Sequence, residues 1–233
     1  MRLRPFFSYY GSKWRLSPRY DDPLHNTIIE PFAGSACYAL QWHWKDVWLV
    51  DRSDHVCSVW NYLIRVSEKE IRKLPLLKPG EAVPTSLPEE ARTLIGFWVT
   101  KGATQPRRSM TNGPNRGHWS ATIRERIASQ LHYIRHWRIK KGCYSELSDV
   151  VATWFIDPPY QVGGSHYTER DIDFDHLAGF CRERRGRVIV YENGDADWLP
   201  FKPFASTKGL RKNSSEVVWT QHNNNKQTAK EQA

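Results

Sequence analysis

Residues 154–160 read Trp-Phe-Ile-Asp-Pro-Pro-Tyr, an apolar run that ends in an acid, two prolines and an aromatic ring. The apolar residues predict a buried strand. Two consecutive prolines cannot continue a strand ladder or a helix, so the chain must turn there and leave Asp157 at the strand's end. Because each proline also restricts the residue before it, the Asp157 carboxylate, the Pro158 carbonyl and the Tyr160 ring have little freedom. The stretch therefore predicts a preorganised polar and stacking surface, which is typical of an active site.

A second informative segment lies near the N-terminus. Residues 26–29 predict a short buried strand that runs into Glu-Pro-Phe-Ala-Gly-Ser at 30–35, and helical character follows over 36–44. Strand, small-residue turn and helix is the dinucleotide-type arrangement, in which glycine lets the backbone approach a ligand and the helix N-terminus faces it. The full G-x-G-x-x-G pattern is absent, so generic phosphate binding is poorly supported.

A further strand, residues 47–50, ends at Asp51. In doubly wound folds an acid at this place accepts hydrogen bonds from ribose hydroxyl groups. The alternative role is a helix cap, but Asp54 suits that role better because it directly precedes the helical stretch 55–74. We therefore expect Asp51 to contact a ligand and Asp54 to cap the helix.

The middle of the chain has a different character. Residues 75–88 are rich in proline and predict a connection, a helix is expected over 89–101, and residues 103–117 form a polar, basic loop. Ser120 is placed to cap a further helix. Its apolar face would carry Ile123, Ile127, Leu131 and Ile134, while Arg124, Arg135 and Arg138 would fall together on another face.

Charge is concentrated in this middle segment. The chain has a formal net charge of +9, and between Lys101 and Lys141 ten Lys or Arg face a single acid, Glu125. Basic residues interleaved with His, Trp and Tyr suit a polyanion with flat bases, which means nucleic acid. The alternative is a solvated basic surface. The expected DNA contacts are Arg107, Arg108, Arg116, Arg124, Arg135 and Lys140.

Composition narrows the class of protein. A chain of 233 residues with 39% hydrophobic content is long and apolar enough for a real core. No apolar run approaches the length of a membrane span, so we expect a cytoplasmic protein with no membrane partner. Neither a zinc site nor a disulfide framework is predicted, because the cysteines are scattered without a C-x-x-C pair at Cys37, Cys57, Cys143 and Cys181.

The C-terminal third continues the alternation of strands and helices. Residues 161–173, which include His166 and Tyr167, predict an irregular loop suited to closing over a base. A helix is expected over 174–185, a strand over 187–191 and a last strand or hairpin around 217–219. The Asn-, Gln- and Lys-rich tail, residues 222–233, is predicted to be disordered.

Together these segments resemble the DNA adenine-N6 methyltransferase family, in its Dam-like and phage-type branch, the D12 class with the DPPY motif. The resemblance covers most of the chain except the middle segment and the tail. Ala36 departs from it, since the family often has a further glycine there, and we expect an altered cofactor affinity. The matching stretches are Tyr9-Tyr10-Gly11-Ser12-Lys13, Glu30-Pro31-Phe32-Ala33-Gly34-Ser35, Asp51 and Asp157-Pro158-Pro159-Tyr160.

The resemblance implies an α/β, Rossmann-like S-adenosylmethionine-dependent methyltransferase fold with an inserted, mainly helical target-recognition subdomain. The catalytic domain would comprise residues 1–74 and 145–221, and the insert residues 75–144. It implies S-adenosyl-L-methionine as cofactor, double-stranded DNA as partner, no metal, and a monomer in a bacterial or phage-infected cell. The enzyme would act alone or within a restriction-modification pair.

Residue roles follow from the same resemblance. Asp157 and the Pro158 carbonyl would accept the two hydrogens of an adenine N6 amine, and Tyr160 would stack on the flipped base. For Phe32 a place in the core is an equal alternative. The expected catalytic residues are Asp157, Pro158, Pro159 and Tyr160, and the expected cofactor residues are Tyr10, Gly11, Lys13, Glu30, Phe32, Gly34, Ser35, Asp51 and Asp157.

Other functions remain open on sequence grounds. Cytosine N4 methylation uses the same geometry, although that group more often has Ser in place of Asp157. RNA adenine or protein glutamine methylation uses related tetrapeptides, but the basic, aromatic middle segment favours nucleic acid over protein. A catalytically silent DNA-binding module with the same fold is the alternative from a different class of protein.

Overall fold

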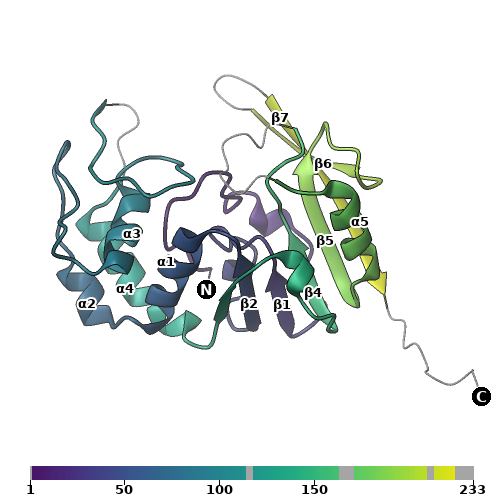
Figure 1. Ribbon diagram of the computed structural model, residues 1–233, viewed down its shortest axis with the longest axis horizontal. Coiled ribbons are helices and arrows are strands. Elements are labelled where there is room, and N and C mark those ends of the chain that lie inside the picture. The colour runs from purple at the N-terminus through teal and green to yellow at the C-terminus, as the bar shows by residue number, and fades with distance from the viewer. Residues whose placement is uncertain (1, 114–117, 163–170, 209–212, 224–233) are drawn as a thin grey trace, which may run out of the picture.

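The computed structural model describes residues 2–113, 118–162, 171–208 and 213–223. The predicted α/β class is confirmed by a seven-stranded sheet of order β3-β2-β1-β4-β5-β7-β6 (Figure 1). Strands β3 to β5 in this order are parallel, and β6 and β7 form an antiparallel hairpin on β5. The strands are β1 (Thr27–Glu30), β2 (Asp46–Asp51), β3 (Arg138–Lys141), β4 (Ala152–Ile156), β5 (Gly186–Asn193), β6 (Lys202–Lys208) and β7 (Asn213–Asn223).

The central strands are apolar on both faces, as expected for parallel strands covered on each side. In β4, Trp154 and Ile156 pack on one face of the sheet and Phe155 on the other. The first face is covered by α5 (Phe174–Glu183), and the second by α1 (Asp54–Arg65) with the N-terminal segment. This alternation fixes the register of β4 and leaves Asp157 directly after its last residue.

The helical stretch expected over 55–74 is two helices, α1 and α2 (Glu68–Lys73). Ser67 is the N-cap of α2 and forms a capping box with Glu70. Asp54 was expected to cap α1, and this is wrong. Ser53 is the cap, because its hydroxyl accepts from the Val56 N–H, while Asp54 is the first helical residue and pairs with Lys141 at 2.6 Å.

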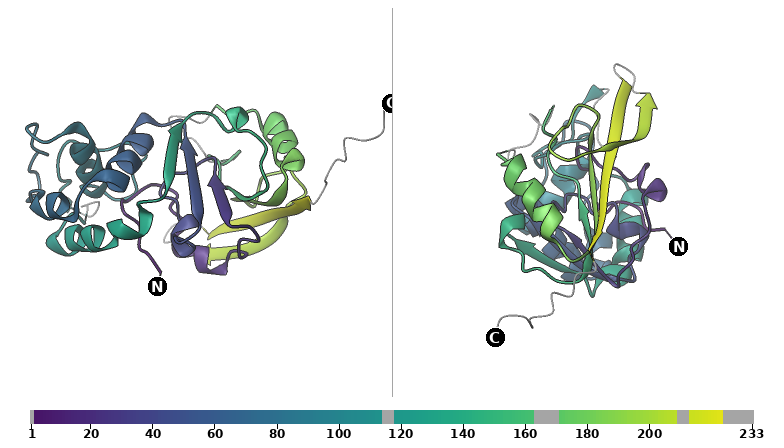
Figure 2. Two further views of the ribbon diagram at one scale, coloured as in Figure 1. Left: turned by 90° about the horizontal axis from the view of Figure 1, so that it is seen from below. Right: turned by 90° about the vertical axis from the view of Figure 1, so that its right-hand side faces the viewer.

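The helices of the middle segment lie beside α1 at the β3 end of the sheet, and the β6–β7 hairpin lies at the opposite end (Figure 2). They are α3 (Glu89–Trp98) and α4 (Ala121–Gln130), followed by a 3-10 turn, η4 (Leu131–Ile134). The predicted Ser120 cap of α4 is confirmed. Apolar side chains of α3 and α4 belong to the same core cluster as those of the sheet.

Two predictions of secondary structure, one in the middle segment and one after β1, are wrong. Arg138 was expected on a helix face, but it begins β3, which pairs in parallel with residues 48–51 of β2. Residues 138–141, which the predicted insert of 75–144 includes, are therefore part of the sheet. No α-helix follows the loop after β1 either: residues 36–44 contain only the 3-10 turn η2 (Ala39–Gln41).

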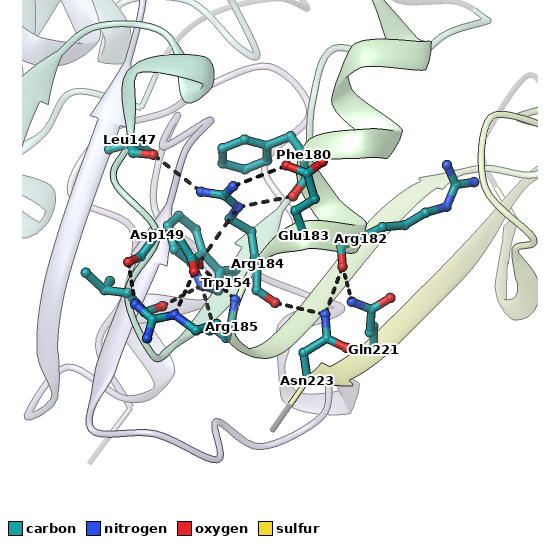
Figure 3. A network of polar contacts seen from close by, with 11 residues as sticks. Leu147, Asp149, Trp154, Phe180, Arg182, Glu183, Arg184, Arg185, Gln221 and Asn223 are labelled. Carbon is teal, nitrogen blue, oxygen red and sulfur yellow. Dashed lines mark hydrogen bonds and ion pairs between the residues drawn. The ribbon is translucent and has the colours of Figure 1, made fainter. Parts of the chain in front are cut away.

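The remaining 3-10 turns are η1 (Ser17–Arg19) and η5 (Tyr144–Glu146). At the amino end of β4, a polar network joins three parts of the chain (Figure 3). Asp149 accepts from the Arg185 backbone N–H at 2.9 Å and from Arg185 Nε at 2.7 Å. Asn223 of β7 donates to the Arg182 carbonyl at 2.8 Å. This network anchors the end of β4 that lies opposite Asp157.

None of the helices within the described ranges combines the length and the apolarity needed to cross a membrane.

Candidate active site

A cavity lies at the carboxyl ends of β1, β2 and β4. Between β1 and β4 the strand order reverses, and ligands of open α/β sheets bind in the crevice at such a switch point. The cavity is lined by the N-terminal segment, the loop after β1, the end of β2 and the turn after β4. Every predicted cofactor residue is among the lining: Tyr10, Gly11, Lys13, Glu30, Phe32, Gly34, Ser35, Asp51 and Asp157.

Gly34 is held from two sides. Its N–H donates to Asp51 Oδ2 at 3.0 Å, and its carbonyl accepts from Trp60 Nε1 at 2.8 Å. Its φ of +44° lies in the left-handed region, and a Cβ there would lie 3.3 Å from the Tyr9 ring. Asp51 also accepts from the Ser53 N–H at 2.9 Å, so this carboxylate organises the loop as well as lining the cavity.

Ala36 also has a left-handed backbone, with φ +50°. It is buried, and its N–H donates to the Ala33 carbonyl at 2.7 Å in the tight turn. A residue with a Cβ is strained in this conformation by roughly 1–2 kcal/mol. Two left-handed residues in three positions also explain why the predicted helix does not start here, since a right-handed helix requires negative φ.

We expect opposite results from two substitutions in this loop. Ala36→Gly removes the strain at a left-handed position and should preserve or raise Tm, whereas Gly34→Ala adds strain and a contact with Tyr9. Gly34→Ala should therefore lower the free energy of unfolding by roughly 1–2 kcal/mol. Thermal unfolding of the two variants measures both effects. Equal Tm values for the two variants would contradict the loop geometry.

Glu30 ends β1 and is buried, with 2% of its surface exposed. Its Oε1 accepts from the Ala39 N–H at 2.7 Å, which holds the end of the loop against the strand. Burial raises the pKa of Glu30 to about 8, although the Ala39 hydrogen bond opposes this. Glu30 therefore favours the neutral acid at pH 7 and can donate a hydrogen bond as well as accept one.

A buried thiol ties the N-terminal segment to the loop after β1. Cys37 Sγ lies 3.1 Å from Ser12 Oγ and 3.3 Å from Ser35 Oγ. Burial raises the pKa of Cys37 to about 11, so the thiol stays neutral. Sequence reasoning assigned this cysteine no role in the site, and a lone cysteine offers no local signal for one.

Asp157 lines the cavity together with Pro159, whereas Pro158, which is buried, and Tyr160 are not among its lining residues. Burial raises the pKa of Asp157 to about 6, the Lys13 ammonium group acts to lower it, and the Glu216 carboxylate acts to raise it. Asp157 is therefore largely ionised at neutral pH and becomes protonated in mild acid.

Tyr160 packs against the N-terminal segment. Lys13 Nζ lies 4.4 Å from the centre of the Tyr160 ring, a cation–π contact. The same ammonium group lies 3.4 Å from Glu216 Oε1 on β7. The predicted catalytic and cofactor segments thus meet at Lys13, and Glu216 is a neighbour that sequence reasoning missed.

The chain after Tyr160 is fixed by a second acid that sequence reasoning missed. Glu192 at the end of β5 is fully buried, and its Oε2 accepts from the Gln161 N–H at 3.2 Å and from Trp198 Nε1 at 3.4 Å. Gln161 and Asp197 exchange two further hydrogen bonds of 3.0 and 3.2 Å. The sequence does contain a signal for this role, because Glu192 is an acid at the end of the strand that pairs with β4.

The predicted DNA-contacting residues divide into three groups, which are exposed residues, residues bound to the ends of helices, and residues outside the described ranges. Arg107 and Arg108 are exposed, and their loop is anchored by the Arg107 N–H on the Gly96 carbonyl at 3.0 Å. The same loop reaches the cavity through Thr104 and Gln105. Lys140 is exposed on β3. The predictions for Arg116, His166 and Tyr167 fall outside the described residues.

Arg124 and Arg135 do not form the expected arginine face for phosphate groups. Arg135 donates to the Ile64 and Val66 carbonyls, each at 2.6 Å, where α1 ends. Arg124 donates to the Leu74 carbonyl after α2. The last carbonyls of a helix lack partners within the helix and carry partial negative charge, so they compete for these guanidinium groups. Both arginines stabilise helix ends.

Comparisons with protein families, curated proteins and solved structures add no evidence on the activity of this protein. No protein-family model and no curated protein matches the chain. Among solved structures, an Escherichia coli protein titled "Putative methyltransferase yhhF" is similar over 84% of this chain and 75% of its own, with 8% identity and a TM-score of 0.36. A likeness of this degree says nothing about activity, so function must be inferred from the geometry of the cavity.

Proposed function

We propose that the protein transfers a methyl group from S-adenosylmethionine to the N6 amine of a flipped-out adenine in duplex DNA. The supporting observation is one cavity that gathers Glu30, Gly34 and Asp51 with Asp157 and Pro159 of the turn after β4, at the switch point between β1 and β4. The fold would be Rossmann-like and the protein a monomer. Residues 75–137 would be the target-recognition insert, and 1–74 with 138–221 the catalytic domain.

The chemistry of the lining fits this cofactor. Asp51 is a carboxylate at the end of β2, suited to accept hydrogen bonds from ribose hydroxyl groups. Gly34 leaves space that a Cβ would fill, and Phe32 offers an apolar surface. Glu30, Ser35, Tyr10 and Lys13 complete the polar wall. When bound, S-adenosylmethionine would supply an electrophilic methyl group: the new C–N bond to the amine would form as the S–CH₃ bond breaks, S-adenosylhomocysteine would leave, and one amine proton would pass to solvent.

The residues of the turn after β4 would activate the amine. An exocyclic amine is a poor nucleophile because its lone pair is delocalised into the ring. Asp157 and the Pro158 carbonyl accept its two hydrogens and favour a localised lone pair, while Tyr160 stacks on the base. Acceptors fixed in advance stabilise the positive charge that develops on nitrogen, an effect of about 10²- to 10³-fold per group in comparable sites.

The basic loop would compensate the cost of taking the base out of the duplex. Flipping a paired base costs roughly a few kcal/mol. Arg107 and Arg108 are exposed next to Thr104 and Gln105, which line the cavity, so phosphate contacts at this loop would hold the DNA near the site. Exposed Lys140 is a further candidate contact, whereas Arg116 is proposed on sequence grounds alone.

The substrate class can be tested by offering three acceptors under identical conditions. The purified protein is incubated with methyl-labelled S-adenosylmethionine and duplex DNA, structured RNA, or a mixture of unmodified proteins. We expect label in DNA alone. Label in RNA or protein, or in no acceptor, would contradict the proposal, and a protein that binds DNA without transferring label would be the silent binding module.

We expect the double variant Arg107→Ala with Arg108→Ala to weaken DNA binding while leaving cofactor binding unchanged. Both side chains are exposed, so loss of two phosphate contacts should lower affinity by about tenfold or more and reduce the salt slope by roughly two. Fluorescence anisotropy at several salt concentrations measures this. Arg135→Ala is the matched control: it removes a helix-end contact, so Tm should fall while the salt slope stays.

A further inference from the structure

An ion pair joins the N-terminal segment to β7 beside the turn after β4. Lys13 comes from the N-terminal segment and Glu216 from β7, and their charged atoms lie 3.4 Å apart. Only 11% and 8% of the two side chains is exposed. Glu216 faces Asn193, the last residue of β5, across the β5–β7 pair, so the sheet places its carboxylate near the carboxyl ends of the strands.

The surroundings of Lys13 explain why a carboxylate is needed there. Burial alone would lower the pKa of Lys13, but Asp157 and Glu216 together raise it above its ordinary value, so the ammonium group stays charged. An unpaired buried cation beside the cavity would be costly and would oppose a cationic ligand. With two carboxylates around one ammonium group, this wall instead carries a net negative charge.

We infer that Glu216 is a positioning residue that acts through Lys13, holding the ammonium group against Tyr160 and beside Asp157 in the wall that would face a cationic cofactor. The inference rests on the proposed function. It assigns the β6–β7 hairpin a role in the site, because the hairpin carries Glu216. Glu216 touches neither the amine nor the cofactor in this account, and no chemical step is assigned to it.

The test uses the substitution Glu216→Gln, which keeps the shape of the side chain and removes its charge. We expect kcat/KM for S-adenosylmethionine to fall by about tenfold, mainly through KM. On a Lys13→Met background the same substitution should change kcat/KM by less than about twofold, because the residue through which Glu216 acts is gone. Full additivity of the two losses would overturn the inference.

The acid limb of the pH–rate profile distinguishes this role from a purely structural one, because a purely structural role would leave the limb in place. Ionised Asp157 is the group that accepts a hydrogen of the amine, so the rate should fall as pH drops through the Asp157 pKa of about 6. Lys13 lowers this pKa, so Lys13→Met should move the limb to higher pH. Glu216→Gln releases the ammonium group from its place beside Asp157 and should move the limb in the same direction. A carboxylate that acted only through its own charge, which raises this pKa, would move the limb to lower pH when removed, and that result would overturn the inference. Asp157 in turn acts on the other titratable groups near it, which are Glu30, Cys37, Tyr20, Tyr160 and Glu192.

Controls separate this inference from the proposed function. Glu216→Asp keeps the charge and should keep the position of the limb. Glu183→Gln makes the same change of charge at an exposed site on α5 and should change nothing. A ¹³C NMR titration of the Asp157 carboxyl reports the same shift without any methyl acceptor. An unchanged Asp157 titration in Glu216→Gln would overturn the inference, whereas a shifted titration in a protein that methylates nothing would overturn only the proposed function.

Discussion

Asp157→Asn and Asp157→Ala are expected to reduce methyl transfer to DNA by at least about 10²- to 10³-fold. In the proposed mechanism the substitution removes the carboxylate that would accept a hydrogen of the amine, and Asn presents an N–H donor where an acceptor is required. Because Asp157 is also part of the cavity wall, kcat measured at saturating cofactor is the decisive quantity. A variant that retains a tenth of the rate would contradict the assigned role.

The same substitution should not weaken the fold. Burial raises the pKa of Asp157 to about 6 from its ordinary value of 3.8, so folding disfavours its ionised form, and this destabilisation develops as pH rises from 3.8 through 6. At neutral pH the uncharged Asn should therefore preserve or raise Tm. Asp195→Asn, an exposed acid on the neighbouring turn, is the matched control and should leave both rate and Tm unchanged.

Gly186→Ala is expected to lower the free energy of unfolding by about 4 kcal/mol or more. Gly186 begins β5 with φ +94°, and a Cβ there would lie 2.2 Å from the Ala152 carbonyl oxygen and 2.8 Å from the Ala152 nitrogen. Both atoms belong to the backbone of β4, so no side-chain rearrangement can relieve the overlap. The pairing of β4 with β5, which carries Asp157 and Glu192 to the same edge, would be lost.

Gly179→Ala is the control for Gly186→Ala. Gly179 lies within α5, where a Cβ would meet nothing within 4 Å. Alanine there should raise the free energy of unfolding by roughly 0.5–1 kcal/mol, because glycine is a poor helix former. Urea denaturation of both variants measures the contrast. Two variants of equal stability would contradict the backbone described at the start of β5.

The sequence predicted the parts of the site whose constraints are local. The apolar run before Asp157, the prolines after it and the small-residue loop at 30–35 restrict the backbone regardless of the rest of the chain. Asp51 followed from its place at the end of a strand. Members of each of these segments line one cavity, because parallel neighbouring strands bring their carboxyl ends to the same edge.

Features that depend on contacts between distant segments were missed. Glu216 joins the site through a hairpin that lies about 200 residues from Lys13 in the sequence, and nothing local to either residue indicates the pair. Arg124 and Arg135 were misinterpreted because helical periodicity does not reveal which neighbouring helix ends lie within reach of a guanidinium group. The absence of an α-helix after Gly34 follows from backbone conformations at Gly34 and Ala36 that apolar periodicity does not encode.

The central claim is that an adenine N6 amine is the atom methylated. Duplex DNA containing all four bases is treated with the protein and S-adenosylmethionine, digested to nucleosides and separated by liquid chromatography with mass detection, with Asp157→Asn as the parallel sample. The account predicts N6-methyldeoxyadenosine in the wild-type sample and at least about a hundredfold less in the variant. N4-methyldeoxycytidine as the product, or DNA without any methylated nucleoside, would contradict it.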